Sequence, residues 1–192
     1  MRKPEPTKDD KESSLIKRVA NGDREAFREL YSICERRLYA YLIKMTGNQA
    51  DAEDLVIEVM LAVWQAAKTF KGNSRLSTWI LGIAHNKAMN TISKTGRQTT
   101  TELEQAADLA SAEPDPHSRQ VEREQHERIS TALQQLSAEH RVVIELTFYH
   151  GRSYAEIAQI AGCPVNTVKT RMFYAKQHLK QILAAEGIEG GF

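Results

Sequence analysis

The segment SYAEIAQIAGCPVNTVKTR, residues 153–171, decides the fold of the second half of this chain. Ser153 and Glu156 have the spacing of a capping box, in which each side chain satisfies a backbone N–H at a helix start. Gly162 favours the left-handed backbone that ends a helix, and Pro164 suits the first position of the next helix. Two short helices joined by so tight a turn predict a helix-turn-helix, whose second helix enters a DNA major groove.

The apolar residues around this turn predict the core of a small helical domain. Ile157 and Ile160 lie on one face of the first helix, because residues three apart are neighbours on a helix surface. Val165 and Val168 in the second helix are expected to face back toward them. The apolar positions upstream indicate two more helices in the same domain.

The second helix of the motif is cationic. From Val165 to Ala185 it carries Lys and Arg but neither Asp nor Glu. Arg and Lys in its early turns can donate to guanine, a Phe ring or a Thr methyl can touch thymine, and cations further along can bind phosphates. The alternative is an ordinary three-helix module with a cationic exposed face. The predicted DNA contacts are Thr167, Lys169, Thr170, Arg171, Phe173 and Lys176.

The first half of the chain shows helical apolar spacing and almost no strand pattern. Asp23 can cap a long helix whose apolar stripe runs from Phe27 to Met45. Gly72 and its neighbours break the chain between two later helices. Four helices with short connections predict one small helical domain. The expected helices lie at about residues 15–19, 23–45, 50–70 and 75–94.

Charge is segregated along the chain although the net charge is only +1. Residues 14–97 carry 13 Lys and Arg against 8 Asp and Glu, a balance of +5, whereas residues 98–118 carry 5 acids and no Lys or Arg, a balance of −5. Within the first block, 59–97 contains six cations and no acid. Such a stretch indicates binding to a polyanion, and the alternative is a solvated face.

The acidic segment 98–118 predicts a linker, because it contains Pro114 and Pro116 and no clear apolar period. A charged, proline-containing segment is expected to be extended and mobile. The chain then divides into a flexible tail (1–13), a helical domain (14–97), the linker (98–118), a helix-turn-helix domain (119–186) and a C-terminal tail (187–192).

Nothing in the sequence indicates catalysis, a metal or a cofactor. Cys34 and Cys163 are far apart, which suits a reducing cytosol. The six histidines lack metal-site spacing, and no glycine-rich phosphate loop is present. Neither a signal peptide nor a bilayer-spanning run is found, so we expect a cytoplasmic protein.

A series of short motifs in the first half resembles one known family. In order, they are Gly22-Asp23, Ala26-Phe27, Leu30-Tyr31, Asp51-Ala-Glu-Asp-Leu-Val56, Val63-Trp64, Phe70-Lys-Gly72, Ser77-Thr-Trp79 and Ile83-Ala-His-Asn86. Together with 153–171, this series resembles the extracytoplasmic-function (ECF) branch of bacterial sigma factors, over residues 14 to about 183. The resemblance implies an all-α, two-domain protein that binds core RNA polymerase and directs promoter recognition and opening. The polymerase would supply the chemistry, and an anti-sigma factor would be a further partner.

The resemblance also implies roles for two helices. The helix that begins with Asp51-Ala-Glu-Asp would bind a coiled coil on the largest polymerase subunit, the second-largest subunit being a further partner. Acids there could instead compensate the helix dipole. The residues assigned to polymerase binding are Asp51, Glu53, Asp54, Leu55 and Glu58.

The loop after this helix and the next helix would read the −10 promoter element, where a flipped base is held in a pocket. Asn86 would supply an amide, Phe70 a wall and Lys87 a phosphate contact. Trp79 fits the core better than a stacking platform. The residues assigned to the −10 element are Phe70, Lys71, Arg75, Asn86, Lys87 and Lys94.

Four positions depart from the family pattern. Ile57 stands where Gln is common, Asn166 where Gly is usual and Tyr174 where a basic residue is frequent. His85 stands where Arg or a small residue is more usual, and, beside Asn86, it is better placed to touch DNA than a metal. These departures suggest an unusual promoter sequence. The linker would thread the polymerase cleft as an anionic strand or serve as a plain tether.

Two other functions fit parts of the sequence. A helix-turn-helix regulator would bind duplex DNA alone, usually as a dimer on a palindrome. A helical adaptor would not bind DNA, and the acid-free stretch 59–97 argues against it. A steep salt dependence of DNA affinity would indicate phosphate contacts and argue further against the adaptor.

Overall fold

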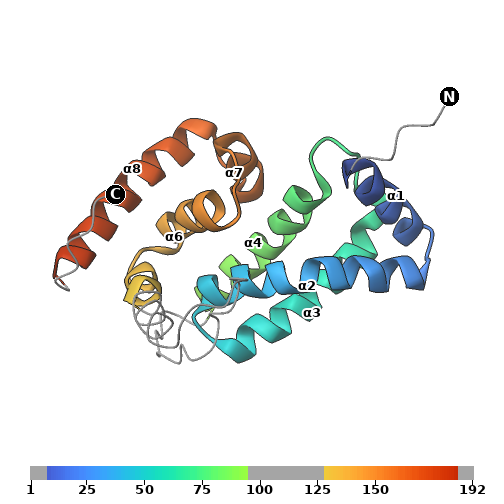
Figure 1. The fold of residues 1–192 in the computed structure, drawn as a ribbon, viewed down its shortest axis with the longest axis horizontal. Helices are drawn as coiled ribbons and strands as arrows, with labels where there is room; N and C mark the ends of the chain where they lie inside the picture. Colours follow the sequence, from blue (N-terminus) through green and yellow to red (C-terminus); the bar gives the residue numbers. More distant parts are fainter. Residues whose placement is uncertain (1–7, 95–127, 186–192) are drawn as a thin grey trace, which may run out of the picture.

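The computed structural model describes residues 8–94 and 128–185, and every regular element within these two ranges is helical (Figure 1). The all-α prediction is therefore confirmed. The predicted linker 98–118 lies outside the described residues. No helix in the described part of the chain is long and apolar enough to cross a membrane.

The first domain consists of α1 (Lys8–Ala20), α2 (Arg24–Thr46), α3 (Gln49–Ala66), a short 3-10 turn (Ala67–Thr69) and α4 (Leu76–Lys94). Helix α1 begins at Lys8, so part of the predicted N-terminal tail is helical instead. Asp23 caps α2 by accepting hydrogen bonds from the backbone N–H groups of Glu25 and Ala26. Gly47 ends α2 at a φ of 70°, a conformation that favours glycine.

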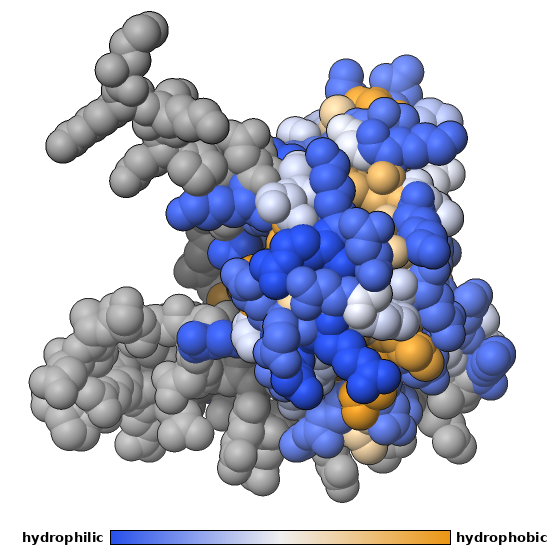
Figure 2. Space-filling model, turned by 90° about the vertical axis from the view of Figure 1, so that its right-hand side faces the viewer, coloured by the Kyte–Doolittle hydropathy of each residue, from blue (hydrophilic) through white to orange (hydrophobic). Residues whose placement is uncertain are grey.

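Helix α2 lies in the middle of this domain and packs against α1, α3 and α4. Its predicted apolar stripe is buried at Leu30, Leu38, Tyr41, Leu42 and Met45. The end of the molecule that carries α1 is mostly hydrophilic, with apolar areas that are small and separate (Figure 2).

The second domain contains a helical segment at 128–134, then α6 (Ala138–Ile144), a π-helical turn (Glu145–Tyr149), α7 (Tyr154–Ala161) and α8 (Val165–Ala185). The capping box of Ser153 and Glu156 and the left-handed Gly162, with φ 60°, are both confirmed. Val168 is buried, as predicted. Val165 was also predicted to face the core, and this is wrong, because Val165 is 39% exposed. Val165 is the first residue of α8, and its exposure places it on the outer side of the first turn.

The two domains pack directly against each other. Helix α4 of the first domain lies beside α7 of the second, and the end of α2 contacts α6 (Figure 1). The sequence predicted two domains joined by a linker and gave no indication of a contact between them. The described helices therefore share an interdomain interface, in which α4 meets α7 and α2 meets α6.

Candidate nucleic-acid and polymerase interfaces

Helix α8 presents a cationic, partly aromatic outer surface. Lys169, Thr170, Phe173 and Lys176 are exposed. The Lys176 ammonium lies 5.6 Å from the ring centroid of Phe148. This surface has the chemistry of a major-groove reader, namely cations for guanine and phosphate and an exposed ring for thymine methyl groups.

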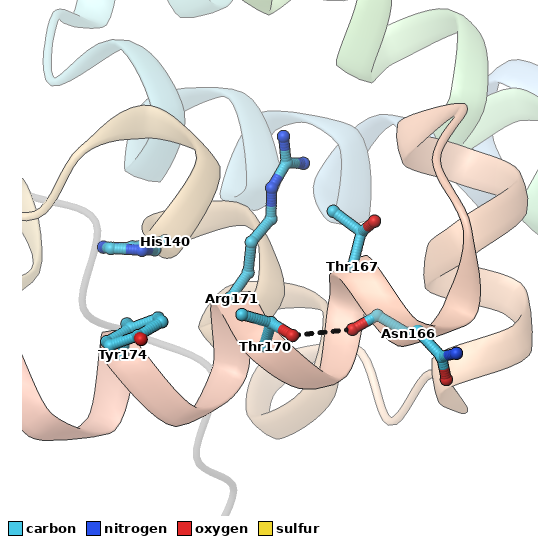
Figure 3. Close-up of a pocket in the computed structure, with 6 residues that line it drawn as sticks. All are labelled: His140, Asn166, Thr167, Thr170, Arg171 and Tyr174. Atoms are coloured by element: carbon cyan, nitrogen blue, oxygen red, sulfur yellow. Dashed lines mark hydrogen bonds between the residues drawn. The ribbon is translucent and has the colours of Figure 1, made fainter.

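Arg171 extends in another direction, toward the helices of the first domain (Figure 3). Its Nη1 lies 3.9 Å from the Cys163 Sγ, and its charge adds to burial in lowering the pKa of His85 on α4. Arg171 also lines a shallow hollow of about 300 Å³ together with His140, Asn166, Thr167, Thr170 and Tyr174. In this structure Arg171 and Thr167 are half-buried, apart from the other predicted contacts of α8.

The residues predicted to read the −10 element are spread along α4 and the loop before it. The Phe70 and Trp79 rings pack with centroids 5.3 Å apart, and both are half-buried. Lys71, Arg75, Asn86 and Lys94 are exposed. Asn86 is two helical turns from Trp79, or about 10 Å along the axis. Phe70 therefore packs near the start of α4, whereas Asn86 lies about two turns further along the helix.

Two residues of α4 contact protein rather than solvent. The Lys87 ammonium lies 2.8 Å from a Glu58 carboxylate oxygen on α3, so a predicted phosphate contact is paired with a predicted polymerase contact. His85 is only 8% exposed, and its Nδ1 lies 3.2 Å from the Tyr41 hydroxyl. The expectation that His85 faces DNA is therefore wrong, because α2 and the second domain cover it.

Helix α3 combines acids with exposed apolar side chains. Glu53, Asp54 and Glu58 are exposed, and Asp51 is half-buried in the first turn. The same helix carries Ile57, 61% exposed, and Leu61, 53% exposed. Leu61 was missed by the sequence analysis, although its i+4 spacing from Ile57 places both on one face.

Leu55, in contrast, is buried in the core of the first domain. It belongs to the opposite face of α3 from Ile57, since adjacent positions on a helix diverge by about 100°. Leu55 therefore supports the acidic face by packing rather than by contact with a partner.

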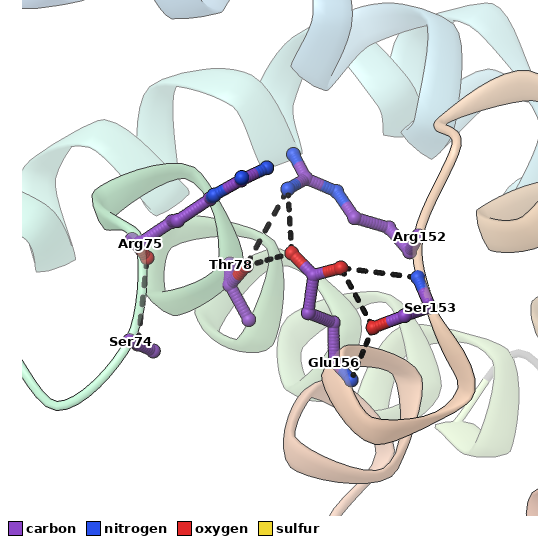
Figure 4. Close-up of polar contacts among 6 residues, drawn as sticks. All are labelled: Ser74, Arg75, Thr78, Arg152, Ser153 and Glu156. Atoms are coloured by element: carbon purple, nitrogen blue, oxygen red, sulfur yellow. Dashed lines mark hydrogen bonds and ion pairs between the residues drawn. The ribbon is translucent and has the colours of Figure 1, made fainter. Parts of the chain in front are cut away.

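A polar network joins α4 to the start of α7 (Figure 4). The Thr78 hydroxyl donates to Glu156 Oε1 at 3.1 Å, and Arg152 Nη1 donates to the same oxygen at 3.2 Å. The other carboxylate oxygen accepts from the Ser153 backbone N–H and hydroxyl, at 3.0 and 2.9 Å. Burial alone would raise the pKa of Glu156, but these hydrogen bonds outweigh it and lower the pKa to about 2. The capping box thus also serves as an interdomain contact.

Arg141 on α6 joins the two domains at a second place. Its guanidinium is buried and donates to backbone carbonyl oxygens at helix ends, where such groups lack helical partners. The acceptors are Met45 at 2.7 Å, Lys44 at 3.4 Å, Gln134 at 2.6 Å, Leu133 at 3.0 Å and Leu136 at 3.1 Å. One side chain thereby connects the end of α2 to the second domain.

Buried titratable groups at the interface make stability depend on pH. Burial is the main cause that lowers the pKa of His85 and of His150 to about 4, and it also lowers the pKa of His140. Both His85 and His150 contribute stability that is present above about pH 6.5 and lost as pH falls toward 4. Glu145 has the opposite effect. Burial raises its pKa to about 7, so its contribution to stability grows as the pH falls through this value. Between about pH 6.5 and 4.5, the stability lost through the two histidines exceeds the stability gained through the one glutamate.

We therefore expect the melting temperature of the full chain to fall between about pH 7 and pH 5. Thermal unfolding followed by circular dichroism at both pH values measures this. In the double variant His85→Gln, His150→Gln the dependence is expected to vanish or to reverse, since Glu145 remains. An unchanged pH dependence in that variant would show that other groups cause it.

Two family models match this chain, one in each of its two domains. Residues 30–98 match the family model of Sigma-70 region 2, and residues 126–179 match that of Sigma-70 region 4. Over 172 residues the chain is 32% identical to the ECF RNA polymerase sigma factor SigL of Mycobacterium tuberculosis, covering 88% of this chain and 96% of that protein. The chain belongs to the ECF sigma factors. As a sigma factor, it binds core RNA polymerase and promoter DNA and directs transcription initiation at specific promoters.

Other relatives agree with this assignment. The ECF RNA polymerase sigma-E factor of Haemophilus influenzae is 29% identical over 177 residues, covering 88% of this sigma factor and 93% of the relative. Among solved structures, RpoE of Bartonella quintana, in complex with the anti-sigma factor NepR, aligns with a TM-score of 0.62 at 26% identity, over 82% of this chain and 96% of that one. CnrH, in complex with the cytosolic domain of CnrY, aligns with a TM-score of 0.69 at 22% identity over 91% and 97%, a likeness of fold.

The members of this family are transcription initiation factors. Within the described residues, the sigma factor has no group of three or more His, Cys, Asp or Glu side chains that could hold a metal ion. Its two candidate surfaces, on α3 and on α8, lie within the regions matched by the family models. The roles of individual residues on these surfaces stay predictions.

Proposed function

We propose that this sigma factor binds core polymerase through α3, reads the −10 element with α4 and the loop before it, and reads the −35 element with α8. The observation that carries the proposal is the exposure of Ile57 and Leu61 on α3, beside Asp54 and Glu58. Large apolar side chains exposed together indicate a protein-binding site, and the flanking acids suit charge-assisted contacts with basic side chains of a partner.

In this proposal the polymerase performs the chemistry and the sigma factor works in the cytoplasm, where the polymerase is. The domain limits 14–97 and 119–186 are part of it, with α1 extending the first domain to Lys8. An anti-sigma factor is a further proposed partner, by analogy with the Bartonella quintana relative solved in complex with one.

Run-off transcription with sigma-free core polymerase tests the proposal. Core polymerase plus the purified chain is expected to initiate from a subset of promoters in a genomic library, whereas the chain alone binds the same fragments poorly. Tight, specific binding of the chain alone to a palindromic duplex would instead support a dimeric regulator.

Lys169→Ala is expected to weaken use of promoters with the matching −35 element by about tenfold, since one good base contact contributes about 1–3 kcal/mol. Run-off transcription with saturating core polymerase measures this. Lys180→Ala, an exposed cation further along α8, is the matched control. Equal losses for both variants on all promoters would mean that Lys169 binds phosphate without reading sequence.

A further inference from the structure

Helix α8 carries two rows of side chains along its length, and both rows repeat the spacing i, i+4, i+7 and i+11. This spacing keeps residues on one face of a helix. The first row consists of Lys169, Phe173, Lys176 and Lys180. The second row consists of Thr167, Arg171, Tyr174 and His178. The two rows are offset by two residues, or about 200° around the axis, so they lie on nearly opposite flanks of α8.

Both flanks of a recognition helix face phosphates when the helix lies in a major groove. A helix with its side chains is about 10–12 Å wide and fills a groove of about 12 Å, so one flank faces each DNA strand. The first row brings three lysines, which keep their charge at neutral and acidic pH. The second row brings one permanent cation, Arg171, and one imidazole, His178. The two flanks are therefore unequal in charge at neutral pH.

A second imidazole reaches the flank of Arg171 from α6. The His140 and His178 rings pack edge to face, with their centroids 5.2 Å apart. His140 also lines the shallow hollow beside Arg171 and Tyr174 (Figure 3). Its Nδ1 is buried and has no hydrogen-bond partner in the described part of the chain. Two titratable rings therefore lie together at the flank that has a single permanent cation.

The surroundings of His140 disfavour its protonation while no DNA is bound. Burial is the main cause that lowers the pKa of His140, and the charges of His178 and Arg171 lower it further, whereas Glu139 on α6 raises it. Helix α8 offers no acid, since Val165 to Ala185 contains neither Asp nor Glu. A phosphate beside the rings would reverse this balance, because a nearby opposite charge favours the charged form. Protonation and phosphate binding at this flank should therefore favour each other.

We propose that His140 and His178 form, together with Arg171, a proton-dependent binding site for a phosphate of the −35 DNA, on the strand opposite to the one that faces the lysine row. The inference rests on the proposed function of α8. The pair takes up about one proton when DNA binds, because two adjacent imidazolium rings repel each other. The sigma factor therefore holds −35 promoters more tightly at mildly acidic pH than at neutral pH.

Binding of the holoenzyme to a promoter fragment at about pH 6 and about pH 7.5 tests the proposal, since an imidazole changes charge between these values. The wild type is expected to bind at least about fivefold more tightly at the lower pH. Its affinity should also depend more steeply on salt there, with a slope larger by about one, as for one added phosphate contact. A purely structural role of the two rings would not change this slope.

Variants at the two rings separate their effect from that of other titrating groups. The double variant His140→Gln, His178→Gln is expected to lose the fivefold gain and the steeper slope at about pH 6. His178→Arg carries a permanent cation and is expected to bind tightly at both pH values. The matched control is Gln181→Ala, an exposed neutral position on α8 that should keep the wild-type pH response.

Two results would overturn the proposal: a double variant with the full pH response of the wild type, or the same loss of response in Gln181→Ala. Partial unfolding in acid would not imitate the expected result, because it would weaken binding at the lower pH instead of strengthening it. Circular dichroism of each variant at both pH values checks the fold.

A second fragment, in which the −35 sequence is scrambled, separates this inference from the proposed function. Equal binding of the wild-type holoenzyme to both fragments would contradict promoter reading by α8. The phosphate site is then decided by the free chain on a nonspecific duplex at low salt. There, a pH response present in the wild type and absent from the double variant would support the site, and equal responses would overturn it.

Discussion

Replacing Arg141 with methionine is expected to lower the free energy of unfolding by about 3 kcal/mol or more. The guanidinium is buried and donates to five backbone carbonyl oxygens from both domains. Methionine keeps much of the volume but no donor, so buried acceptors at helix ends are left without their charged partner. For a chain of this size the melting temperature should fall by roughly 10 °C.

Differential scanning calorimetry measures the loss, and Arg128→Met, at an exposed position, is the control expected to change little. The comparison also reports how the domains unfold. If Arg141 connects them, the variant should show two transitions where the wild type shows one. A melting curve that matches the wild type would mean that water or other donors satisfy these carbonyls equally well.

Ile57→Asp combined with Leu61→Asp is expected to weaken binding to core polymerase by at least about a hundredfold, because burying each apolar side chain contributes about 1.5–3 kcal/mol. The added carboxylates also place charge where an apolar contact is expected. Fluorescence anisotropy of labelled sigma factor titrated with core polymerase measures the affinity. Both residues are exposed, so the fold should be unaffected.

Ile33→Asp on α2 is the matched control, since Ile33 is also apolar and about half exposed. It is expected to leave the affinity for core polymerase near that of the wild type. If the double variant bound polymerase normally, the proposed role of α3 would be wrong. A similar loss for Ile33→Asp would instead extend the interface onto α2.

Local signals allowed the helices to be predicted well. Asp23 caps α2, Ser153 and Glu156 form the capping box, and Gly47 and Gly162 end their helices in the left-handed conformation. Each of these features depends on hydrogen bonds or backbone angles within a few residues. The helix-turn-helix and the four-helix domain follow from these signals and from the apolar periodicity.

The sites were predicted less completely because exposure depends on what another segment covers. Ile57 was noted as a departure, but Leu61 was passed over, since an apolar residue at helical spacing reads equally well as core. Leu55 and Leu61 are the same residue type on one helix, and only the position of the other helices makes one buried and the other exposed.

The sequence by itself determined the all-helical fold, the division into two modules and the cationic character of α8, because caps, periodicity and charge are local properties. Only the tertiary structure decided that His85 is buried, that Arg171 faces inward and that Gly82 lies against α7. Each of these depends on interactions between residues at least 44 positions apart in the sequence. No local pattern encodes such contacts, since they arise when helices far apart in the sequence bury their complementary faces.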